Sequence, residues 1–306
     1  MTMPGRSPSS GFEPSHEPVL VAEVVEWLRP RADGVYVDGT LGLGGHTRAL
    51  IGAGAGRVIG IDRDADAIAE ARRRLADAAD RIVFVHDDYR RVADVLAAEG
   101  LTEVQGMVVD LGVSSMQLDE PARGFSFRQA GPLDMRMDRT RGLTLAERLA
   151  DVTDTELADV IWQYGDERHS RRIARAIVAA RDRGALADTG ALAAVVRRAA
   201  GGKGWQRIDP ATRTFQALRL WVNDEPGGVQ GWLDAAPRCL ARGARLAVIA
   251  FHSIEDRAVK QRFRALAAET DAVVVATRRP VTPRDEECAR NPRARSARLR
   301  VLERVA

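Results

Sequence analysis

The sequence predicts an α/β fold with a doubly wound, mainly parallel sheet and a helical domain inserted into it. Two observations carry this prediction. Short apolar runs alternate with amphipathic helical segments over the first third of the chain, which is typical of right-handed βαβ units. The alternation stops after Asp110 and a strand-like run returns only at Leu246, so a segment without strands interrupts the sheet.

The strands follow from short apolar runs, most of which end at a polar residue. The predicted strands are Val35–Asp38, Val58–Asp62, Ile82–Val85, Val104–Asp110, Leu246–Phe251 and Leu299–Arg304. The segments Ala65–Ala76 and Val92–Ala98 place apolar residues at helical spacing and form the predicted crossovers. Because ligands of such sheets bind at the carboxyl ends of the strands, the residues at these ends are the first candidates for a site.

The interruption is predicted to be helical. Its clearest helices are Thr153–Tyr164, Glu167–Arg183 and Thr189–Ala200, with Asp or Thr near their starts and Gly after two of their ends. The prolines after Arg278 predict a loop that leads to the last strand. The predicted domains are a flexible N-terminal tail, 1–15, a cofactor-binding domain made of 16–115 and 209–306, and an inserted substrate-recognition domain, 116–208.

The stretch VYVDGTLGLGGHTRAL (Val35–Leu50) has the strand, glycine-rich turn and helix of a loop that binds a nucleotide cofactor. A dinucleotide motif, G-x-G-x-x-G, would need a glycine where Thr47 stands, and a Walker motif would need a lysine after the glycines. What remains is Asp38 followed by closely spaced glycines. This arrangement suits a cationic cofactor, with Asp38 orienting either the loop or the ammonium end of that cofactor.

Residues at the next strand ends favour S-adenosylmethionine. Asp62 stands where a carboxylate can bind both ribose hydroxyls, although an enzyme that uses NAD would place an acid there as well. Tyr89 follows the third strand, where its ring can stack on adenine. Asp110 ends the fourth strand, where it faces the methionine moiety or the acceptor, or else caps the next helix.

Seven long blocks, in order, carry a family resemblance. They are HEPVL (His16–Leu20), DGTLGLGGHTRAL (Asp38–Leu50), DLGVSSMQLDEPARGFSFRQAGPLDMRMD (Asp110–Asp138), YGDERHSRRIARAIV (Tyr164–Val178), PATRTFQALRLWVNDE (Pro210–Glu225), FHSIEDRAVK (Phe251–Lys260) and NPRARSARLR (Asn291–Arg300). Together they resemble the RsmH/MraW family of bacterial small-subunit rRNA cytosine N4-methyltransferases. The chain departs from that pattern at Leu41 and Leu43, where relatives often have an aromatic and a basic residue, and at Met116, where proline is common.

The resemblance implies a class I, Rossmann-like S-adenosylmethionine-dependent methyltransferase with an inserted helical domain. It implies methyl transfer to N4 of a cytidine, position 1402, in the decoding centre of 16S rRNA within the 30S subunit. The cofactor-binding residues implied by position are Gly44, Gly45, His46, Asp62, Tyr89, Asp110 and Gln117.

The acceptor side of the predicted site lacks the loop that is familiar from other amine methyltransferases. Amine methyltransferases commonly carry an (Asp/Asn/Ser)-Pro-Pro-(Tyr/Phe) loop after the fourth strand, but here Leu-Gly-Val follows Asp110. We therefore expect Asp110, as the catalytic residue, and the Ser114–Ser115 loop to help form the methyl-transfer site. His252 either contacts the base or caps the helix that follows it. No set of residues has metal-ligand spacing, and no metal is expected.

Two basic clusters predict contacts with RNA phosphates. From Arg168 to Arg183 there are six arginines against one acid, and from Arg278 to the last residue there are nine arginines against four acids. A solvated surface is the alternative reading of such clusters. The predicted RNA-binding residues are Arg168, Arg171, Arg172, Arg175, Arg213, His252, Arg293 and Arg295.

The two cysteines, Cys239 and Cys288, lie far apart, and no apolar run is long enough to span a bilayer, so a cytoplasmic protein is expected. The sequence leaves the oligomeric state open. Three other functions remain as alternatives: an NAD-dependent oxidoreductase, an RNA-binding assembly factor without turnover, and a methyltransferase that modifies amines of another nucleic acid such as DNA.

Overall fold

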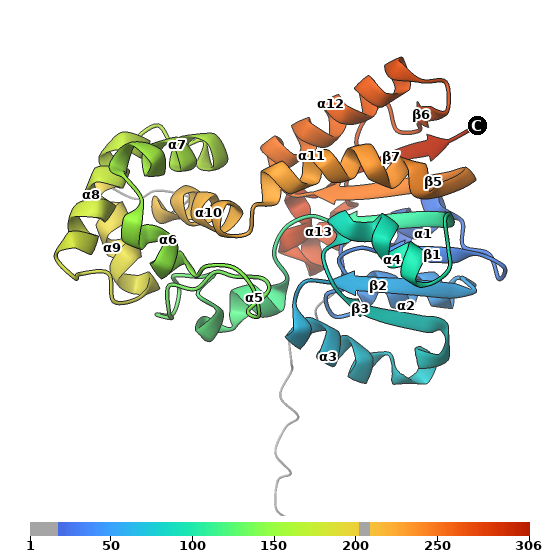
Figure 1. Ribbon diagram of the computed structural model, residues 1–306, viewed down its shortest axis with the longest axis horizontal. Coiled ribbons are helices and arrows are strands. Elements are labelled where there is room, and N and C mark those ends of the chain that lie inside the picture. The colour runs from blue at the N-terminus through green and yellow to red at the C-terminus, as the bar shows by residue number, and fades with distance from the viewer. Residues whose placement is uncertain (1–17, 202–208) are drawn as a thin grey trace, which may run out of the picture.

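A seven-stranded sheet lies at the centre of the computed structural model, which describes residues 18–201 and 209–306 (Figure 1). The strand order is β3-β2-β1-β4-β5-β7-β6; β1 to β5 are parallel, and β7 runs antiparallel to both β5 and β6. The strands are β1 (Val35–Asp38), β2 (Arg57–Asp62), β3 (Ile82–His86), β4 (Val104–Asp110), β5 (Leu240–Ala250), β6 (Val273–Val275) and β7 (Arg298–Arg304). This topology confirms the predicted class I methyltransferase fold.

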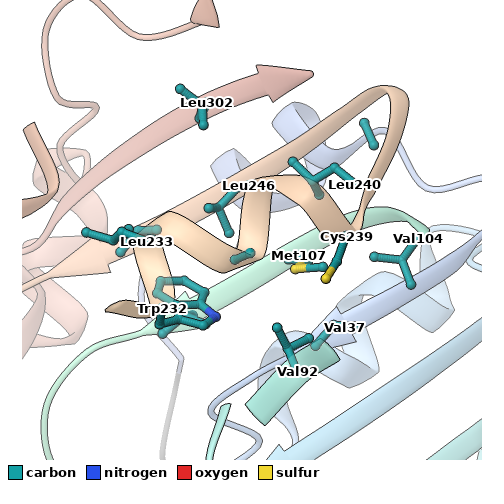
Figure 2. Close-up of a cluster of buried hydrophobic side chains, with 14 of the residues drawn as sticks. Val37, Val92, Val104, Met107, Trp232, Leu233, Cys239, Leu240, Leu246 and Leu302 are labelled. Atoms are coloured by element: carbon teal, nitrogen blue, oxygen red, sulfur yellow. The ribbon is translucent and has the colours of Figure 1, made fainter. Parts of the chain in front are cut away.

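Helices cover both faces of the sheet, which is why the central strands are almost continuously apolar. One face packs against α1 (Val21–Leu28), α2 (Gly45–Gly52) and α3 (Ala65–Arg74). The other face packs against α4 (Val92–Ala98), α11 (Glu225–Ala235) and α12 (Ser253–Glu269). Figure 2 shows part of this second core, where Trp232 and Leu233 of α11 lie close to Leu246 of β5.

A separate helical region lies beyond the carboxyl ends of the parallel strands (Figure 1). Its helices are α6 (Leu145–Asp151), α7 (Asp154–Gly165), α8 (Ser170–Asp182), α9 (Thr189–Ala200) and α10 (Ala211–Val222). They share a core that includes Leu157, Ile173, Leu192 and Leu218. The helix α10 packs mainly on α7, so the helices that share this core extend past residue 208, the predicted end of the inserted domain.

Short elements complete the chain. They are α5 (Ser115–Asp119), α13 (Asp285–Arg290), η1 (Ala76–Arg81), η2 (Tyr89–Arg91), η3 (Pro121–Arg123), η4 (Ala236–Cys239) and η5 (Pro292–Ser296). The tail after Arg278, predicted as a loop, contains α13, η5 and a bridge between Val281 and Leu299, and that prediction is therefore wrong. Pro292 starts η5, and Pro280 and Pro283 lie before α13, on either side of the bridging residue Val281. The predicted tail at 1–15 lies outside the described residues.

Most predicted elements are found with small shifts at their ends. The largest shift is in β5, which begins at Leu240 rather than Leu246, because exposed Arg242 and Gly243 interrupt its apolar pattern. The predicted helix at Glu167–Arg183 starts three residues later, at Ser170, since the backbone of His169 is not helical. The strand β6 was not predicted; it has only three residues and lies at the edge of the sheet.

Candidate functional site

The glycine-rich turn after β1 is closed by Asp38, whose side chain is fully buried. Asp38 Oδ2 accepts hydrogen bonds from the Thr47 backbone N–H (3.1 Å) and hydroxyl (2.8 Å), and Oδ1 accepts one from Thr40 N–H (3.3 Å). Thr47, at the position of the third glycine of a dinucleotide motif, therefore anchors the first turn of α2 to β1. Of the two roles expected for Asp38, these contacts support the orientation of the loop.

Gly44, Gly45 and His46 form the junction between this turn and α2. Gly44 has a positive φ of 82°, and a Cβ on Gly45 would lie 2.5 Å from Pro18 Cγ, so both glycines are required by local geometry. His46 is 5% exposed, and its Nε2 lies 4.0 Å from Asp110 Oδ2. The turn thus reaches the end of β4, where Asp110 stands.

Asp62 links the glycine turn to the loop after β2. Its Oδ2 accepts a hydrogen bond from Gly42 N–H (2.7 Å), and its Oδ1 accepts one from Asp64 N–H (2.9 Å). Burial raises the pKa of Asp62 to about 6, and the negative charges of Asp64 and Asp38 act in the same direction. Burial also raises the pKa of Asp38 to about 6.

Asp110 ends β4, and its backbone N–H donates to Thr40 Oγ1 (2.7 Å). Its Oδ1 is buried and accepts no hydrogen bond within the described part of the chain, although 26% of the side chain is exposed. Burial holds the pKa of Asp110 well above its ordinary value, and the charges of Asp38 and Glu255 add to this effect. The carboxyl ends of β2, β1 and β4 therefore bring together three carboxylates, none of which pairs with a described arginine or lysine.

Tyr89 begins η2, three residues after the end of β3, and its ring packs edge-on against Trp232 of α11 with the centroids 5.1 Å apart. Burial raises the pKa of its hydroxyl far above the ordinary value, with Asp88 and Glu225 contributing, so the side chain stays neutral. The ring lies on the side of the sheet end where the sequence predicts adenine. Trp232 fixes its orientation.

Gln117, also predicted to bind the cofactor, lies in a buried polar network. Its Nε2 donates to Asp64 Oδ2 (2.9 Å), and its Oε1 accepts from Ser114 N–H (3.1 Å). Ser114 in turn caps α5 by accepting from Gln117 N–H (3.2 Å). The side chain is thus engaged with Asp64, and its contact with the cofactor stays a prediction.

Charged residues that sequence reasoning missed lie where α10, α11 and α12 meet, at the expected acceptor side of the site. Arg219 of α10 donates to Glu225 Oε1 (3.2 Å), and its Nη2 lies 3.9 Å from Glu255 Oε1. This Nη2 is buried and has no hydrogen-bond partner among the described residues. Burial raises the pKa of both glutamates. The only sequence signal was the position of the three residues inside blocks that resemble the family.

His252 caps α12 by a reciprocal hydrogen-bond pattern with Glu255, whose Oε2 accepts from the His252 and Phe251 backbone N–H groups. Burial lowers the pKa of His252 to about 4, and the charge of Arg219 acts in the same direction, so the ring is neutral near pH 7. Of the two roles expected for His252, the structure supports the capping role. Contact with a base stays a prediction.

A cleft of about 370 Å³ lies between the sheet end and the helical region. Its arginines are paired: Asp88 lies 3.3 Å from Arg63 and 2.7 Å from Arg90, and Arg91 lies 3.1 Å from Asp87. Asn223, at the end of α10, lines the cleft and donates to Met135 O (2.8 Å). Five arginines and three aspartates line the cleft, and each of these arginines lies within 4 Å of an acid.

The arginines predicted to bind RNA lie on two separate parts of the molecule. Arg168 lies just before α8, and Arg171, Arg172 and Arg175 lie in its first half. The helix α8 lies on the side of the helical region away from the sheet (Figure 1). Arg172 also donates to the carbonyl of Ala200 (2.5 Å).

The other predicted arginines lie closer to the sheet or already have partners. Arg213 on α10 is exposed and donates to Asp166 O (3.0 Å). On η5, Arg293 pairs with Asp119 (2.9 Å), while Arg295 is exposed.

Within the described residues, no three or more His, Cys, Asp or Glu side chains form a group that would hold a metal ion. None of the helices described is long and apolar enough to cross a membrane.

Comparison with known proteins identifies close relatives. The model of the MraW methylase family matches residues 13–305. Among the relatives of this chain are proteins that carry the name ribosomal RNA small subunit methyltransferase H. The Sorangium cellulosum protein is 52% identical over 95% of this chain and 91% of its own, and that of Anaeromyxobacter sp. strain K is 50% identical over 95% and 98%. The Deinococcus radiodurans protein is 48% identical over 99% of this chain and 95% of its own.

Proposed function

This chain belongs to the MraW methylase family, and on that basis we propose that it methylates the 16S rRNA of the small ribosomal subunit, at N4 of cytidine 1402. The cofactor is S-adenosylmethionine. The relatives' names support the rRNA of the small subunit as substrate. The nucleotide and the atom are the finer part of the proposal, and they rest on the family resemblance of the sequence.

The observation that carries the proposal is the set of three carboxylates, Asp38, Asp62 and Asp110, at adjacent strand ends. Each has its pKa raised by burial, and the buried Oδ1 of Asp110 accepts no hydrogen bond from a described residue. Such a site favours a ligand that carries positive charge. S-adenosylmethionine supplies a transferable methyl group on a cationic sulfonium and carries an ammonium group as well.

In this proposal, the residues around the site have separate roles in binding the cofactor. Asp38 and Asp62 hold the glycine turn in place through backbone hydrogen bonds, and Asp62 stands where the ribose is expected. Tyr89 offers a neutral aromatic face for the adenine. Asp110 faces the reacting end, between the glycine turn and the acceptor side. The contacts of Gly44, Gly45, His46 and Gln117 with the cofactor belong to the same proposal.

Cytosine N4 is a poor nucleophile because its lone pair is delocalised into the ring, so the enzyme must hold the amine in line and accept its N–H hydrogen bonds. Buried carboxylates suit that task. Asp110 and Glu255 are close enough for the charge of Glu255 to raise the cost of ionising Asp110, and Glu255 is fixed by the backbone of Phe251 and His252. They take the place of the missing Pro-Pro loop in this proposal.

The helical region is assigned to substrate recognition. It stands beyond the strand ends, where the acceptor has to enter, and it carries the arginines at the start of α8. We place the second boundary of this domain at the end of α10, Val222, rather than at residue 208, because α10 packs in the core of this region.

Labelled S-adenosylmethionine offered with unmodified 30S subunits, free 16S rRNA, tRNA and DNA tests the proposal. Label is expected on 30S subunits, and mass spectrometry of the digested rRNA is expected to place it at N4 of cytidine 1402. Label only on tRNA or DNA would refute the substrate. Binding of 30S subunits without transfer would instead favour an assembly factor.

A further inference from the structure

A second hollow, of about 230 Å³, lies between α12 and the β6–β7 edge of the sheet, away from the cleft already described. Four cationic side chains line it, contributed by Lys260, Arg264, Arg278 and Arg300. The hydroxyl-bearing Thr277 and two apolar side chains complete the lining, and no carboxylate belongs to it. We refer to this hollow as the basic pocket.

The positive charge of the basic pocket is largely uncompensated. The acid next to the basic pocket is Asp256, and two arginines share its carboxylate. Arg300 donates to both of its oxygens (2.7 and 3.2 Å), and Arg298 donates to one of them (3.0 Å). Neither Lys260 nor Arg264 forms an ion pair or side-chain hydrogen bond with a described residue, and the same holds for Arg278.

The cleft at the strand ends provides an internal comparison. It is also rich in arginine, but Asp87, Asp88 and Asp138 line it too, and each of these acids lies within 4 Å of an arginine. A site whose arginines are each paired with an acid gains less from an anion than a site with unpaired cations. The basic pocket lacks such matching, and its base is formed in part by Phe263 and the buried guanidinium of Arg300, where water screens charge less than at the open surface.

The position of the basic pocket relates it to the acceptor side. His252 caps the N-terminus of α12 next to Glu255, and Lys260 and Arg264 follow on the same helix. At about 1.5 Å of rise per residue, they lie about 12 and 18 Å along the helix from His252. A strand that places one nucleotide at the acceptor side reaches this distance within a few nucleotides.

We propose that the basic pocket binds a phosphodiester group of the rRNA strand that carries the target nucleotide. The ligand is an anion because the lining donates hydrogen bonds from cations and offers no acidic group. This inference rests on the proposed function for the identity of the strand. It adds a contact surface outside the arginines of α8, α10 and η5.

The test compares two triple variants of the full chain. The pocket variant is Lys260→Gln, Arg264→Gln and Arg278→Gln; it leaves Arg300 in place because that side chain is buried on Asp256. The control variant is Arg31→Gln, Arg81→Gln and Arg242→Gln, which removes the same charge near the amino ends of β1, β3 and β5, from side chains that are also exposed. Calorimetry with S-adenosylmethionine checks that both variants keep the cofactor site.

The pocket variant is expected to raise KM for 30S subunits about tenfold or more with little change in kcat. The slope of log affinity for 16S rRNA against log salt should become shallower by ~0.7 for each phosphate that the variant no longer neutralises. The control variant is expected to match the wild type. Equal KM and equal salt slope in the pocket and control variants would overturn the proposal, even if inorganic phosphate, titrated separately, still bound the wild-type pocket.

The two proposals fail in different ways. If the wild type transfers no methyl group to 30S subunits, the proposed function fails, while filter binding of 16S rRNA still tests the pocket. If the wild type methylates 30S subunits and the pocket variant does so with an unchanged KM, only the pocket proposal fails.

Discussion

Arg123 Nη1 lies 2.6 Å from Asp64 Oδ2, and each of these side chains is only 3% exposed. The pair joins two parts of the molecule. Asp64 follows β2, and its backbone N–H holds the Asp62 carboxylate. Arg123 lies on the segment that leads into the helical region, and its Nη2 also donates to Met137 O (2.9 Å). A buried ion pair therefore links the loop that holds the expected ribose-binding acid to the segment that leads into the helical region.

Replacing Arg123 with Met is expected to lower the free energy of unfolding by about 3–5 kcal/mol, because it leaves the Asp64 carboxylate buried with only Gln117 as a side-chain partner. Urea denaturation measures this change. The matched change at exposed Arg81 should cost less than about 0.5 kcal/mol. The double variant Asp64→Asn, Arg123→Met should recover part of the loss, since it leaves no unpaired buried charge. A loss below about 1 kcal/mol in Arg123→Met would contradict this account.

The Asp64–Arg123 pair could not be predicted from the sequence, whereas the three carboxylates at the strand ends could. Asp38, Asp62 and Asp110 were predictable because each ends an apolar run, and parallel strands bring such ends together. The partner of Asp64 is 59 residues away and lies in a segment without clear periodicity, so no pattern in the sequence connects the two.

The same reason explains the missed residues of the acceptor side. Arg219 sits in an amphipathic helix whose other residues predict only an apolar face, and Glu225 and Glu255 resemble ordinary helix-start acids. Their meeting depends on how α10, α11 and α12 pack. Local signals predicted individual strands and helices, because the apolar pattern of each such element lies among residues that are neighbours along the chain.

Tyr89→Ala is expected to weaken S-adenosylmethionine binding about tenfold, because it removes the aromatic face and leaves Trp232 without its edge-on partner. Tyr89→Phe keeps the ring, and the proposal gives the hydroxyl no role, so its affinity should stay within about twofold of the wild type. Isothermal titration calorimetry measures both. Equal affinities for the Ala and Phe variants would remove Tyr89 from the cofactor site.

Cofactor binding should strengthen as pH rises from about 5 to 7. Asp38 and Asp62 have their pKa raised from 3.8 to about 6 in the free protein, and a cationic ligand favours their ionised forms. Binding then releases protons near pH 6, which calorimetry in buffers of different ionisation enthalpy detects. S-adenosylhomocysteine, which lacks the sulfonium charge, should show a smaller pH effect. Affinity that is independent of pH over this range would count against both carboxylates.

The same two carboxylates should make the cofactor-free protein less stable as pH rises, whereas they make cofactor binding stronger. Because their folded-state pKa lies above the unfolded value, their contribution to stability is fully present below about pH 3.8 and is lost as pH rises through about 6. Saturating cofactor should remove most of this loss. Thermal unfolding with and without the cofactor, at pH 5 and pH 7.5, measures the difference.

The arginines at the start of α8 are expected to contribute to rRNA affinity without touching the cofactor site. The variant Arg168→Gln, Arg171→Gln and Arg175→Gln should weaken binding of 16S rRNA and lower its salt slope, with unchanged affinity for S-adenosylmethionine. Arg172 is left in place because it donates to the carbonyl of Ala200 at the end of α9. The triple variant at Arg31, Arg81 and Arg242 is again the control. If the two variants bind rRNA alike, this face of α8 is a solvated surface.

Asp110→Asn should change stability and activity in opposite directions. Ionised Asp110 is costly in the free protein, since burial and the charges of Asp38 and Glu255 hold its pKa well above the ordinary value. The amide removes that cost, so the melting temperature of the cofactor-free protein is expected to rise at pH 7.5 and to change little below pH 4. Methyl transfer to 30S subunits should fall by about 100-fold or more, because an amide is a weaker acceptor for the N–H groups of an amine that gains positive charge. A variant that is stabilised and fully active would show that Asp110 has no part in the transfer, whereas one that loses both stability and activity would show that its carboxylate holds the fold.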